Sequence, residues 1–150
     1  MPEMDMSNAR HPEQLEKMRR HKESGTCHFC PDGFKEHTAP IIFENGCWFI
    51  TANDYPYDGA IHHYFIVSKT HITDITDVRA IYHLELFHAV KWLRKHLQVK
   101  AYSLFVRSGE MKYTGGSLDH VHFHFLVGGP KPENATLADA VPVVIAYKKK

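Results

Sequence analysis

The chain has 150 residues, of which 18 are Lys or Arg and 17 are Asp or Glu, with a net charge of +1 and 43% hydrophobic residues. This length supports one packed core, and the composition excludes a disordered or collagen-like chain. The balanced charge argues against a nucleic-acid partner, because such binding needs a dominant basic face. No apolar run approaches the roughly 18 residues that span a bilayer, and the acidic start is unlike a signal peptide. We therefore expect a cytoplasmic protein without a membrane partner.

Cysteine and histidine are the residues that call for explanation. The three cysteines are an odd number in a compartment expected to be reducing, so metal binding or simple burial is considered before a disulfide framework. Histidine occurs 13 times. Because imidazole titrates near neutral pH and binds metals, the places where histidines cluster are where chemistry is expected.

The first segment of the chain carries little periodicity. We expect residues 1–10 to form a flexible N-terminus ahead of a single domain over residues 11–150. Pro12 near the start and Gly25 at the end predict a short helix over 11–25. Its few apolar positions indicate a surface helix.

The next segment has the signals of a β-hairpin. Short β-rich runs at 41–43 and 47–51 flank Asn45-Gly46, a dipeptide typical of tight hairpin turns. Cys47 lies in the second run and is interpreted as ordinary apolar filling. A third strand is predicted at 63–67.

One long helix is predicted over 77–97, where apolar residues recur at helical spacing and residue 76 or 77, Thr or Asp, provides the cap. Further extended segments follow at 101–106, 120–127 and 141–147, the last at a sheet edge because it contains a proline. Hairpin-paired strands around one long helix predict an α+β fold. We expect an antiparallel sheet of about five strands with the long helix on one face.

Residues 120–127, with the sequence HVHFHFLV, alternate histidine with apolar residues. Successive strand side chains point to opposite faces, so His120, His122 and His124 share one face. We expect the apolar face to be core and the histidine face to be reactive. The same pattern also fits a solvated strand face that is rich in histidine, or a multi-histidine metal centre, which normally needs a nearby carboxylate.

Cys27 and Cys30 have the spacing of half a zinc site. By themselves they fit a redox couple or two buried thiols equally well.

The stretch HVHFHFL at 120–126 resembles, at each of its positions, the signature of the histidine-triad (HIT) family of nucleotide hydrolases and transferases, in which three histidines alternate with hydrophobic residues. Further segments resemble the family in the same order. These are Asn53-x-Tyr55-Pro56-Tyr57, the strand at 63–67 with Lys69-Thr70-His71, and Gly115-Gly116-Ser117-Leu118. The resemblance covers roughly residues 27–128.

The resemblance implies roles for individual residues. His122, the central histidine, is the nucleophile that forms a nucleotidyl intermediate. His124 donates a hydrogen bond to the phosphate or the leaving group, Ser117 contacts the phosphate and Asn53 binds the ribose. The pair 115–116, with Gly116, is expected to turn backbone N–H groups toward the anion, although it is also the sequence of an ordinary tight turn.

Two positions depart from the family pattern. Arg107-Ser108-Gly109 stands where many members have Asn-x-Gly, and Gly116 stands where the mononucleotide-hydrolysing branch has Gln. Arg107 is able to bind phosphate through two parallel hydrogen bonds, which Asn is not. This favours a more highly phosphorylated substrate, such as a dinucleoside polyphosphate, over other nucleotidyl phosphoesters or phosphoramidates. Ile42 or Phe43 is expected to line the base pocket.

The resemblance also implies a cofactor and an assembly. Zinc-bearing members complete a Cys₂His₂ site, which here implies a structural zinc held by Cys27, Cys30, His71 and His120. A homodimer is implied as well. The enzyme is then a nucleotidyl hydrolase, transferase or phosphorylase. The competing hypothesis is a nucleotide-binding, zinc-stabilised sensor or adaptor without turnover.

Overall fold

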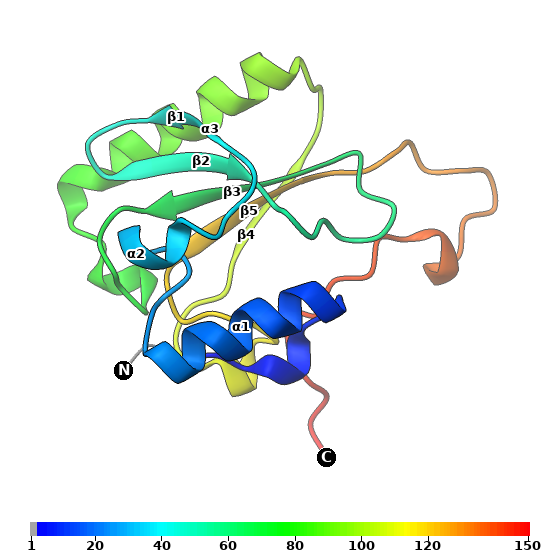
Figure 1. The fold of residues 1–150 in the computed structure, drawn as a ribbon. Coiled ribbons are helices and arrows are strands. Elements are labelled where there is room, and N and C mark those ends of the chain that lie inside the picture. The colour runs from blue at the N-terminus through cyan, green and yellow to red at the C-terminus, as the bar shows by residue number, and fades with distance from the viewer. Residues whose placement is uncertain (1–2) are drawn as a thin grey trace.

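The computed structural model describes residues 3–150, so residues 1 and 2 of the segment predicted to be flexible lie outside the described residues. Five strands form one antiparallel sheet in the order β1-β2-β3-β5-β4 (Figure 1). The α+β class and the five-stranded antiparallel sheet are confirmed. The strands are β1 (Ile41–Glu44), β2 (Trp48–Ala52), β3 (His62–Ser68), β4 (Ser103–Val106) and β5 (His122–Val127).

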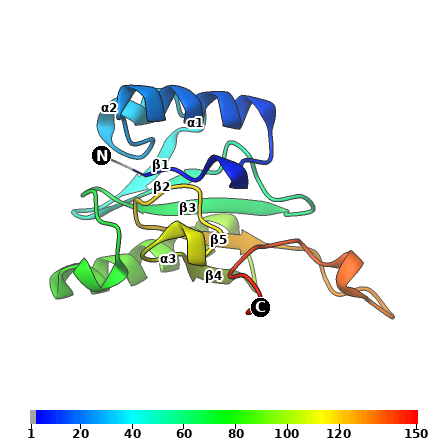
Figure 2. The same ribbon diagram turned by 90° about the horizontal axis from the view of Figure 1, so that it is seen from below.

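The two faces of the sheet are covered by different helices. The long helix α3 (His83–Leu97) packs on one face, while α1 (Pro12–Ser24) and the one-turn helix α2 (Pro31–Phe34) lie over the other (Figure 2). The main core lies under α3, where the apolar positions of β5 face the helix. Its largest buried side chains include Trp48, Ile50, Ile66, Leu93 and Phe125. In the part of the chain that the structure describes, no helix combines the length and hydropathy needed to cross a membrane.

Helix α1 confirms the prediction for residues 11–25. Pro12 occupies its first position, where the missing N–H is not needed. Gly25 ends it with a φ of +68°, a left-handed conformation that glycine adopts without steric cost. Met18 and His21 are nevertheless buried, because they face the sheet.

The long helix begins later than predicted. Helix α3 starts at His83, and residues 75–82 contain two short 3₁₀ turns instead. The predicted cap is wrong too, because the carboxylate of Asp74 accepts the N–H of Thr76 at 2.8 Å and caps the first turn. Val78 then takes extended backbone, with its side chain buried in the core.

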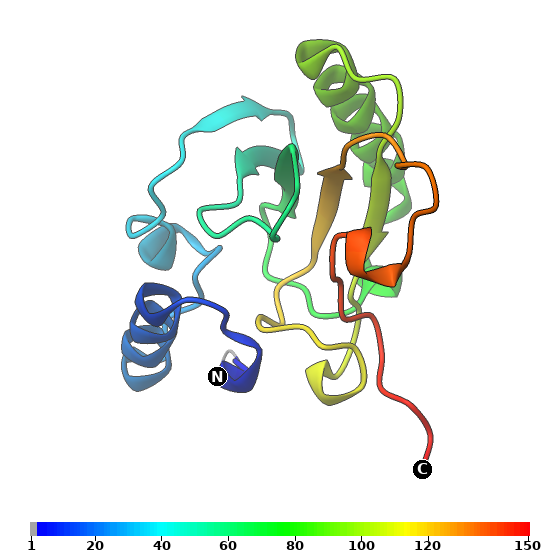
Figure 3. The same cartoon turned by 90° about the vertical axis from the view of Figure 1, so that its right-hand side faces the viewer.

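The predicted edge strand at 141–147 is wrong. This segment forms no strand pairing within the described residues and instead runs past the loop that connects β4 to β5 (Figure 3). Pro142 cannot donate to a strand ladder. The carbonyl of Val144 is bound by Arg107, and a side chain at Gly115, where φ is +72°, would collide with Val144.

The N-terminal segment reaches the same loop from the other side. Met4 is buried and forms a β-bridge with Leu118. The N–H of Asp5 donates to the carbonyl of Ser117 at 3.2 Å, and the side chain of Asn8 donates to the carbonyl of Gly116 at 2.9 Å. These contacts bring the N-terminal segment to the end of β5 that carries the histidines.

Candidate active site and metal cluster

The four predicted metal ligands lie together at one end of the sheet. Cys27 and Cys30 come from the loop before α2, His71 follows β3, and His120 lies just before β5. One donor atom from each lies within 4.8 Å of the other three. The Nδ1 atom of His120 is 3.4 Å from Sγ of Cys27, 3.7 Å from Sγ of Cys30 and 3.2 Å from Nδ1 of His71.

These separations suit a tetrahedral zinc ion. Zinc binds sulfur at about 2.3 Å and nitrogen at about 2.0–2.1 Å, so tetrahedral S and N ligands lie about 3.5 Å apart and two N ligands about 3.3 Å apart. Nε2 of His120 donates to the carbonyl of Ser68 at 2.7 Å, which leaves Nδ1 as the lone-pair donor. Burial raises the pKa of the Cys27 thiol to about 12, so this sulfur keeps its proton unless a cation replaces it.

The histidine face of β5 is covered. Antiparallel pairing places Phe65 opposite His124 and Val67 opposite His122, so β3 and β5 present these side chains on one face. His122 is 8% exposed and His124 4% exposed. The alternation therefore separated the two faces of β5 as expected, but the histidine face lies under the N-terminal half of the chain rather than in open solvent.

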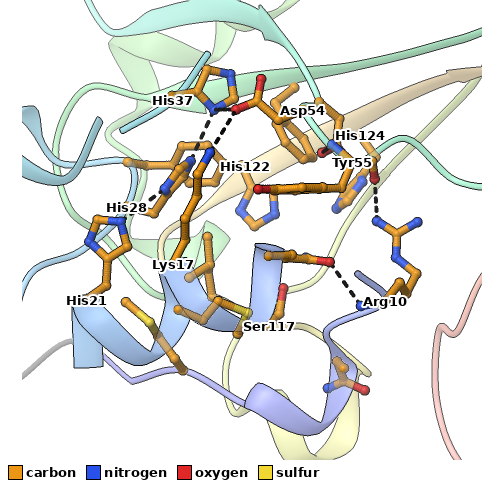
Figure 4. A pocket seen from close by; sticks show the side chains of 18 of the residues that line it. Arg10, Lys17, His21, His28, His37, Asp54, Tyr55, Ser117, His122 and His124 are labelled. Atoms are coloured by element: carbon orange, nitrogen blue, oxygen red, sulfur yellow. Dashed lines mark hydrogen bonds and ion pairs between the residues drawn. The ribbon is translucent and has the colours of Figure 1, made fainter. Parts of the chain in front are cut away.

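His122 lies at the centre of this face, between the rings of Phe29 and Phe65, whose centroids are 4.9 and 5.2 Å away. Its Nδ1 donates to the carbonyl of His120 at 2.5 Å. Its other nitrogen, Nε2, forms no hydrogen bond within residues 3–150, and the side chain lines a cavity (Figure 4). Burial lowers the pKa of His122 to about 4, so the ring is neutral near pH 7 and Nε2 carries a lone pair.

His124 belongs to a chain of polar contacts along the cavity wall. The backbone N–H of Tyr57 lies 3.2 Å from Nδ1 of His63, and Nε2 of His63 lies 2.9 Å from Nδ1 of His124. Nε2 of His124 lies 3.2 Å from Nη1 of Arg107. Burial is the main cause that lowers the pKa of His63, to about 3, and nearby positive charge lowers it further. The same two causes lower the pKa of His124, so both rings are neutral.

The three contacts that join Tyr57, His63, His124 and Arg107 have room for three protons, one in each contact, but the four groups bring four. Both ends, the N–H of Tyr57 and the guanidinium of Arg107, can only donate. Two neutral imidazoles bring two further protons, of which one fits between His63 and His124. One link therefore holds two facing N–H groups. An anion that accepts from both Arg107 and Nε2–H of His124 removes this conflict.

The cavity has a volume of about 90 Å³ and lies between β5 and the N-terminal segment. Gly116, also predicted to bind substrate, is not among the lining residues of the described chain. Its N–H lies 3.3 Å from Oγ1 of Thr114 and its carbonyl accepts from Asn8. The predicted site residues that do line the cavity are Asn53, Arg107, Ser117, His122 and His124.

Arg107 is already engaged inside the fold. Its Nε and Nη2 donate to the carbonyl of Val144 at 3.0 and 2.6 Å, and Nε also donates to the carbonyl of Thr114 at 3.0 Å. Only Nη1 faces His124. The edge of the guanidinium best suited to two parallel hydrogen bonds is therefore occupied by the C-terminal segment.

The residue predicted to bind the ribose lines the cavity, whereas the residues predicted to line the base pocket do not. Asn53 lines the cavity, where Oδ1 accepts a backbone N–H two residues on and Nδ2 lies 3.3 Å from Nδ1 of His63. Ile42 and Phe43 do not line the cavity, and both pack with the core under α3. That prediction is wrong because β1 is the outer strand, separated from β5 by two others.

A second group of histidines lies at the other end of the cavity (Figure 4). Nδ1 of His28 lies 3.5 Å from Nε2 of His21, and Nε2 of His28 lies 3.1 Å from Nδ1 of His37. Glu36 lies 3.1 Å from His21 and Asp54 lies 3.4 Å from His37. Burial lowers the pKa of His28 to about 3. This group ties α1 to the cysteine loop and to the end of β2.

The sequence patterns missed Phe29, His63 and Arg10. His63 had a usable signal, because its strand pairs with β5 and its alternation with Phe65 places both on the face that carries the triad. Phe29 and Arg10 lie outside regular strands, where periodicity says nothing about direction. Only the packing of the N-terminal segment brings them to the cavity.

Comparison with known proteins supports the fold. No protein-family model matches the sequence, and no curated protein matches it significantly. Among solved structures, a HIT family hydrolase from Legionella pneumophila Philadelphia 1 is 27% identical over 71% of this chain and 95% of its own, with a TM-score of 0.52. A histidine triad nucleotide-binding protein from Candida albicans is 23% identical over 74% and 86%, with a TM-score of 0.56. A Zn-bound histidine triad family protein from Mycobacterium smegmatis is 19% identical over 75% and 81%, with a TM-score of 0.54.

The chain therefore has the α+β fold of the histidine triad proteins, with His122 and His124 on β5 beside the cavity and His120 just before this strand. The resemblance to the histidine-triad family that the sequence indicated is confirmed.

Proposed function

We propose that this chain is a histidine triad enzyme, a nucleotidyl hydrolase or transferase in which His122 is the nucleophile. The observation that carries the proposal is the state of His122. Its Nδ1 is bound to a carbonyl, its ring is neutral, and its unpaired Nε2 lies in a cavity beside His124 and Arg107. The similar Candida structure, a nucleotide-binding protein, supports a nucleotide ligand, and the similar structures of HIT family hydrolases support a hydrolytic reaction.

The proposed reaction has two displacements. Nε2 of His122 attacks the α-phosphorus in line, so that an N–P bond forms while the bond from phosphorus to the leaving-group oxygen breaks. The leaving group departs with the electron pair as an anion, which accepts hydrogen bonds from Nε2–H of His124 and from Nη1 of Arg107. The N–H···O bond from Nδ1 to the carbonyl of His120 stabilises the positive charge that the ring acquires. Water, or inorganic phosphate in a phosphorylase, then attacks the phosphorus, and the electron pair of the N–P bond returns to Nε2 of His122. A water that attacks loses its proton to solvent.

The leaving-group side favours an anionic substrate. The contacts between Tyr57, His63, His124 and Arg107 contain one N–H group without an acceptor. A phosphate oxygen that accepts from both His124 and Arg107 provides the missing acceptor. A leaving group that itself begins with a phosphate provides such an oxygen, and an amine does not. We therefore propose a dinucleoside polyphosphate, or a related phosphoester, ahead of a phosphoramidate.

We also propose that Cys27, Cys30, His71 and His120 hold a structural zinc ion. The donor set and its separations fit, and the Zn-bound Mycobacterium relative supports zinc over other metals. A zinc ion with four protein ligands has no open position for substrate, so its chemistry there is to cross-link the cysteine loop to the start of β5.

A rapid-quench experiment tests the proposed function. On mixing with an α-labelled dinucleoside polyphosphate, we expect a burst of acid-labile label on the protein that approaches one per active chain, and no label on the His122→Asn variant. Substrate binding without adduct in the wild type contradicts the enzyme and supports the non-catalytic sensor or adaptor.

A further inference from the structure

The fixed charges that line the cavity are unbalanced. Among the residues that the structure describes, three cationic side chains line it, Arg10, Lys17 and Arg107, against one carboxylate, Asp54. Asp54 is committed elsewhere, since it accepts two backbone N–H groups and lies 3.8 Å from Lys17. Neither arginine has a carboxylate partner at ion-pair distance in residues 3–150. The cavity therefore has an excess of two positive charges.

Arg10 is held beside the triad by aromatic stacking. Its guanidinium carbon lies 4.2 Å from the centre of the Tyr57 ring, and Nη2 donates to the carbonyl of Tyr55 at 2.5 Å (Figure 4). The Tyr57 ring in turn stacks on His124, with centroids 5.8 Å apart, and contacts His63 at 4.4 Å. A guanidinium has five N–H groups, and the hydrogen bond to Tyr55 uses one of them.

The two arginines also repel each other. Burial lowers the pKa of Arg10 and the charge of Arg107 lowers it further, while Tyr57 and Asp58 raise it. After burial, the charge of Arg10 is the next cause of the low pKa of His63. Like charges placed near one another and near neutral imidazoles are unfavourable without a ligand, and a polyanion between them offsets that cost.

The position of Arg10 relative to His122 fixes which part of a nucleotide it meets. His122 lies at the middle of the cavity, with Arg10 and His124 at one end and Lys17 with the second histidine group at the other (Figure 4). Arg107 lies at the same end as His124, because its Nη1 is 3.2 Å from Nε2 of that ring. In the proposed reaction the attacked phosphate lies at His122, and the leaving group lies toward His124, which Arg107 contacts at 3.2 Å. The cationic end therefore lies beyond that phosphate, on the side of the leaving group.

We propose that Arg10 is a phosphate-binding residue that contacts the second phosphate of the substrate, so that the site selects nucleotides with a chain of two or more phosphate groups. This inference rests on the proposed function and deepens it. Arg10 lies ahead of residues 27–128, which carry the resemblance to the family, so the selectivity comes from this chain's own N-terminal segment.

The small volume of the cavity is consistent with this arrangement. About 90 Å³ is less than the roughly 300–1,000 Å³ of typical small-molecule sites. A nucleotide enters only after the segment that carries Arg10 shifts away from the loop at residues 116–118, to which Met4, Asp5 and Asn8 attach it. When this segment returns, it brings the guanidinium onto the phosphate chain.

Equilibrium binding separates the proposal from a structural role. AMP, ADP and ATP are titrated calorimetrically into the wild type, Arg10→Ala, Arg10→Lys and the matched control Arg19→Ala, an exposed arginine of α1 that pairs with Glu16. We expect Arg10→Ala to weaken the binding of ATP and ADP by about 10- to 30-fold and the binding of AMP by less than about threefold. The reason is that a charge-assisted hydrogen bond is lost only when the nucleotide carries a second phosphate. Arg10→Lys restores part of the difference, and Arg19→Ala leaves all three affinities unchanged.

Two results overturn the inference alone. Equal weakening of AMP and ATP shows that Arg10 acts by holding the loop at 55–57, and unchanged affinities in Arg10→Ala show that it does not touch phosphate. If Arg10→Ala does not fold, the same comparison is made with Arg10→Lys and Arg10→Gln. If the wild type binds none of the three nucleotides, the proposed function fails together with the inference.

Discussion

The cluster of proposed metal ligands and the cavity use two histidines, His120 and His122, in opposite ways. His120 binds the carbonyl of Ser68 through Nε2 and turns Nδ1 toward two cysteines. His122 binds the carbonyl of His120 through Nδ1 and turns Nε2 toward the cavity. In each ring, one nitrogen donates a hydrogen bond to a backbone carbonyl, and the surroundings of the other nitrogen determine what the ring is able to bind.

This difference teaches that residue type and strand periodicity do not by themselves assign a role. His120 and His122 are both buried, both lie on the same face and both have a pKa lowered to about 4, with burial as the largest cause. What separates them is the neighbourhood of the remaining nitrogen: two sulfurs and an imidazole for His120, and an open cavity between aromatic rings for His122.

The largest expected effect comes from removing the proposed nucleophile, His122. We expect His122→Asn to reduce kcat/KM by at least about 10³-fold, because no other described nitrogen at the centre of the cavity replaces Nε2. If the two histidines are independent, this variant keeps its zinc and its Tm stays close to that of the wild type. Metal analysis and differential scanning calorimetry check this. Loss of zinc in the His122→Asn variant would contradict the independence of the two histidines.

Removing a metal ligand is expected to act first on stability. Cys27→Ser is expected to lower bound zinc from about one per chain to below about 0.2, and to lower Tm by roughly 8–15 °C, because the loop loses its cross-link to β5. Cys47→Ala, which changes a buried cysteine outside the cluster, is the matched control and keeps its zinc. A wild-type protein purified without chelator that contains no zinc contradicts the proposed site.

The cavity also predicts a dependence of stability on pH. The pKa of folded His63 is about 3, against an ordinary value of 6.5, so the folded state binds fewer protons than the unfolded state between these values. This contribution is complete above pH 6.5 and is lost as the pH falls toward 3, and the loss at pH 5 amounts to about 2 kcal/mol. Chemical denaturation at pH 8 and pH 5 measures it, and His63→Gln is expected to lose about 2 kcal/mol less than the wild type over this range.

The smallest expected effect is that of Arg107. Arg107→Ala is expected to lower kcat/KM for a dinucleoside polyphosphate about tenfold, because only Nη1 faces the site while the rest of the guanidinium holds Val144. Steady-state kinetics with a phosphoramidate as the reference substrate sharpens the result. An unchanged kcat/KM for both substrates removes Arg107 from the site.

Much of the fold followed from local patterns. Pro12 and Gly25 marked α1, the Asn-Gly turn marked the first hairpin, and alternation marked β5. These signals succeed because capping, turns and pleating depend on neighbours in sequence. The predicted start of α3 is wrong because Val78 is drawn into the core, and the predicted strand at 141–147 is wrong because the carbonyl of Val144 is bound by the side chain of Arg107 rather than by a strand.

In the site too, residues within sequence motifs were predictable, whereas contacts between distant segments were not. The metal ligands Cys27, Cys30, His71 and His120 came from the resemblance, and the structure brings them together. The burial of the triad, the contact of His63 with His124 and the approach of Arg10 depend on residues far apart in sequence. Ile42 was misplaced because strand order, which no local pattern contains, puts β1 at the sheet edge.

Phe29 sits between the two cysteines and its ring lies 4.9 Å from that of His122. In the proposed zinc site, the metal would close the short loop that carries Phe29, and this loop supplies one aromatic wall beside His122. Loss of the metal, or oxidation of Cys27 and Cys30, would remove the cross-link that positions this ring. The proposed metal site would then act on His122 through Phe29, without contacting it.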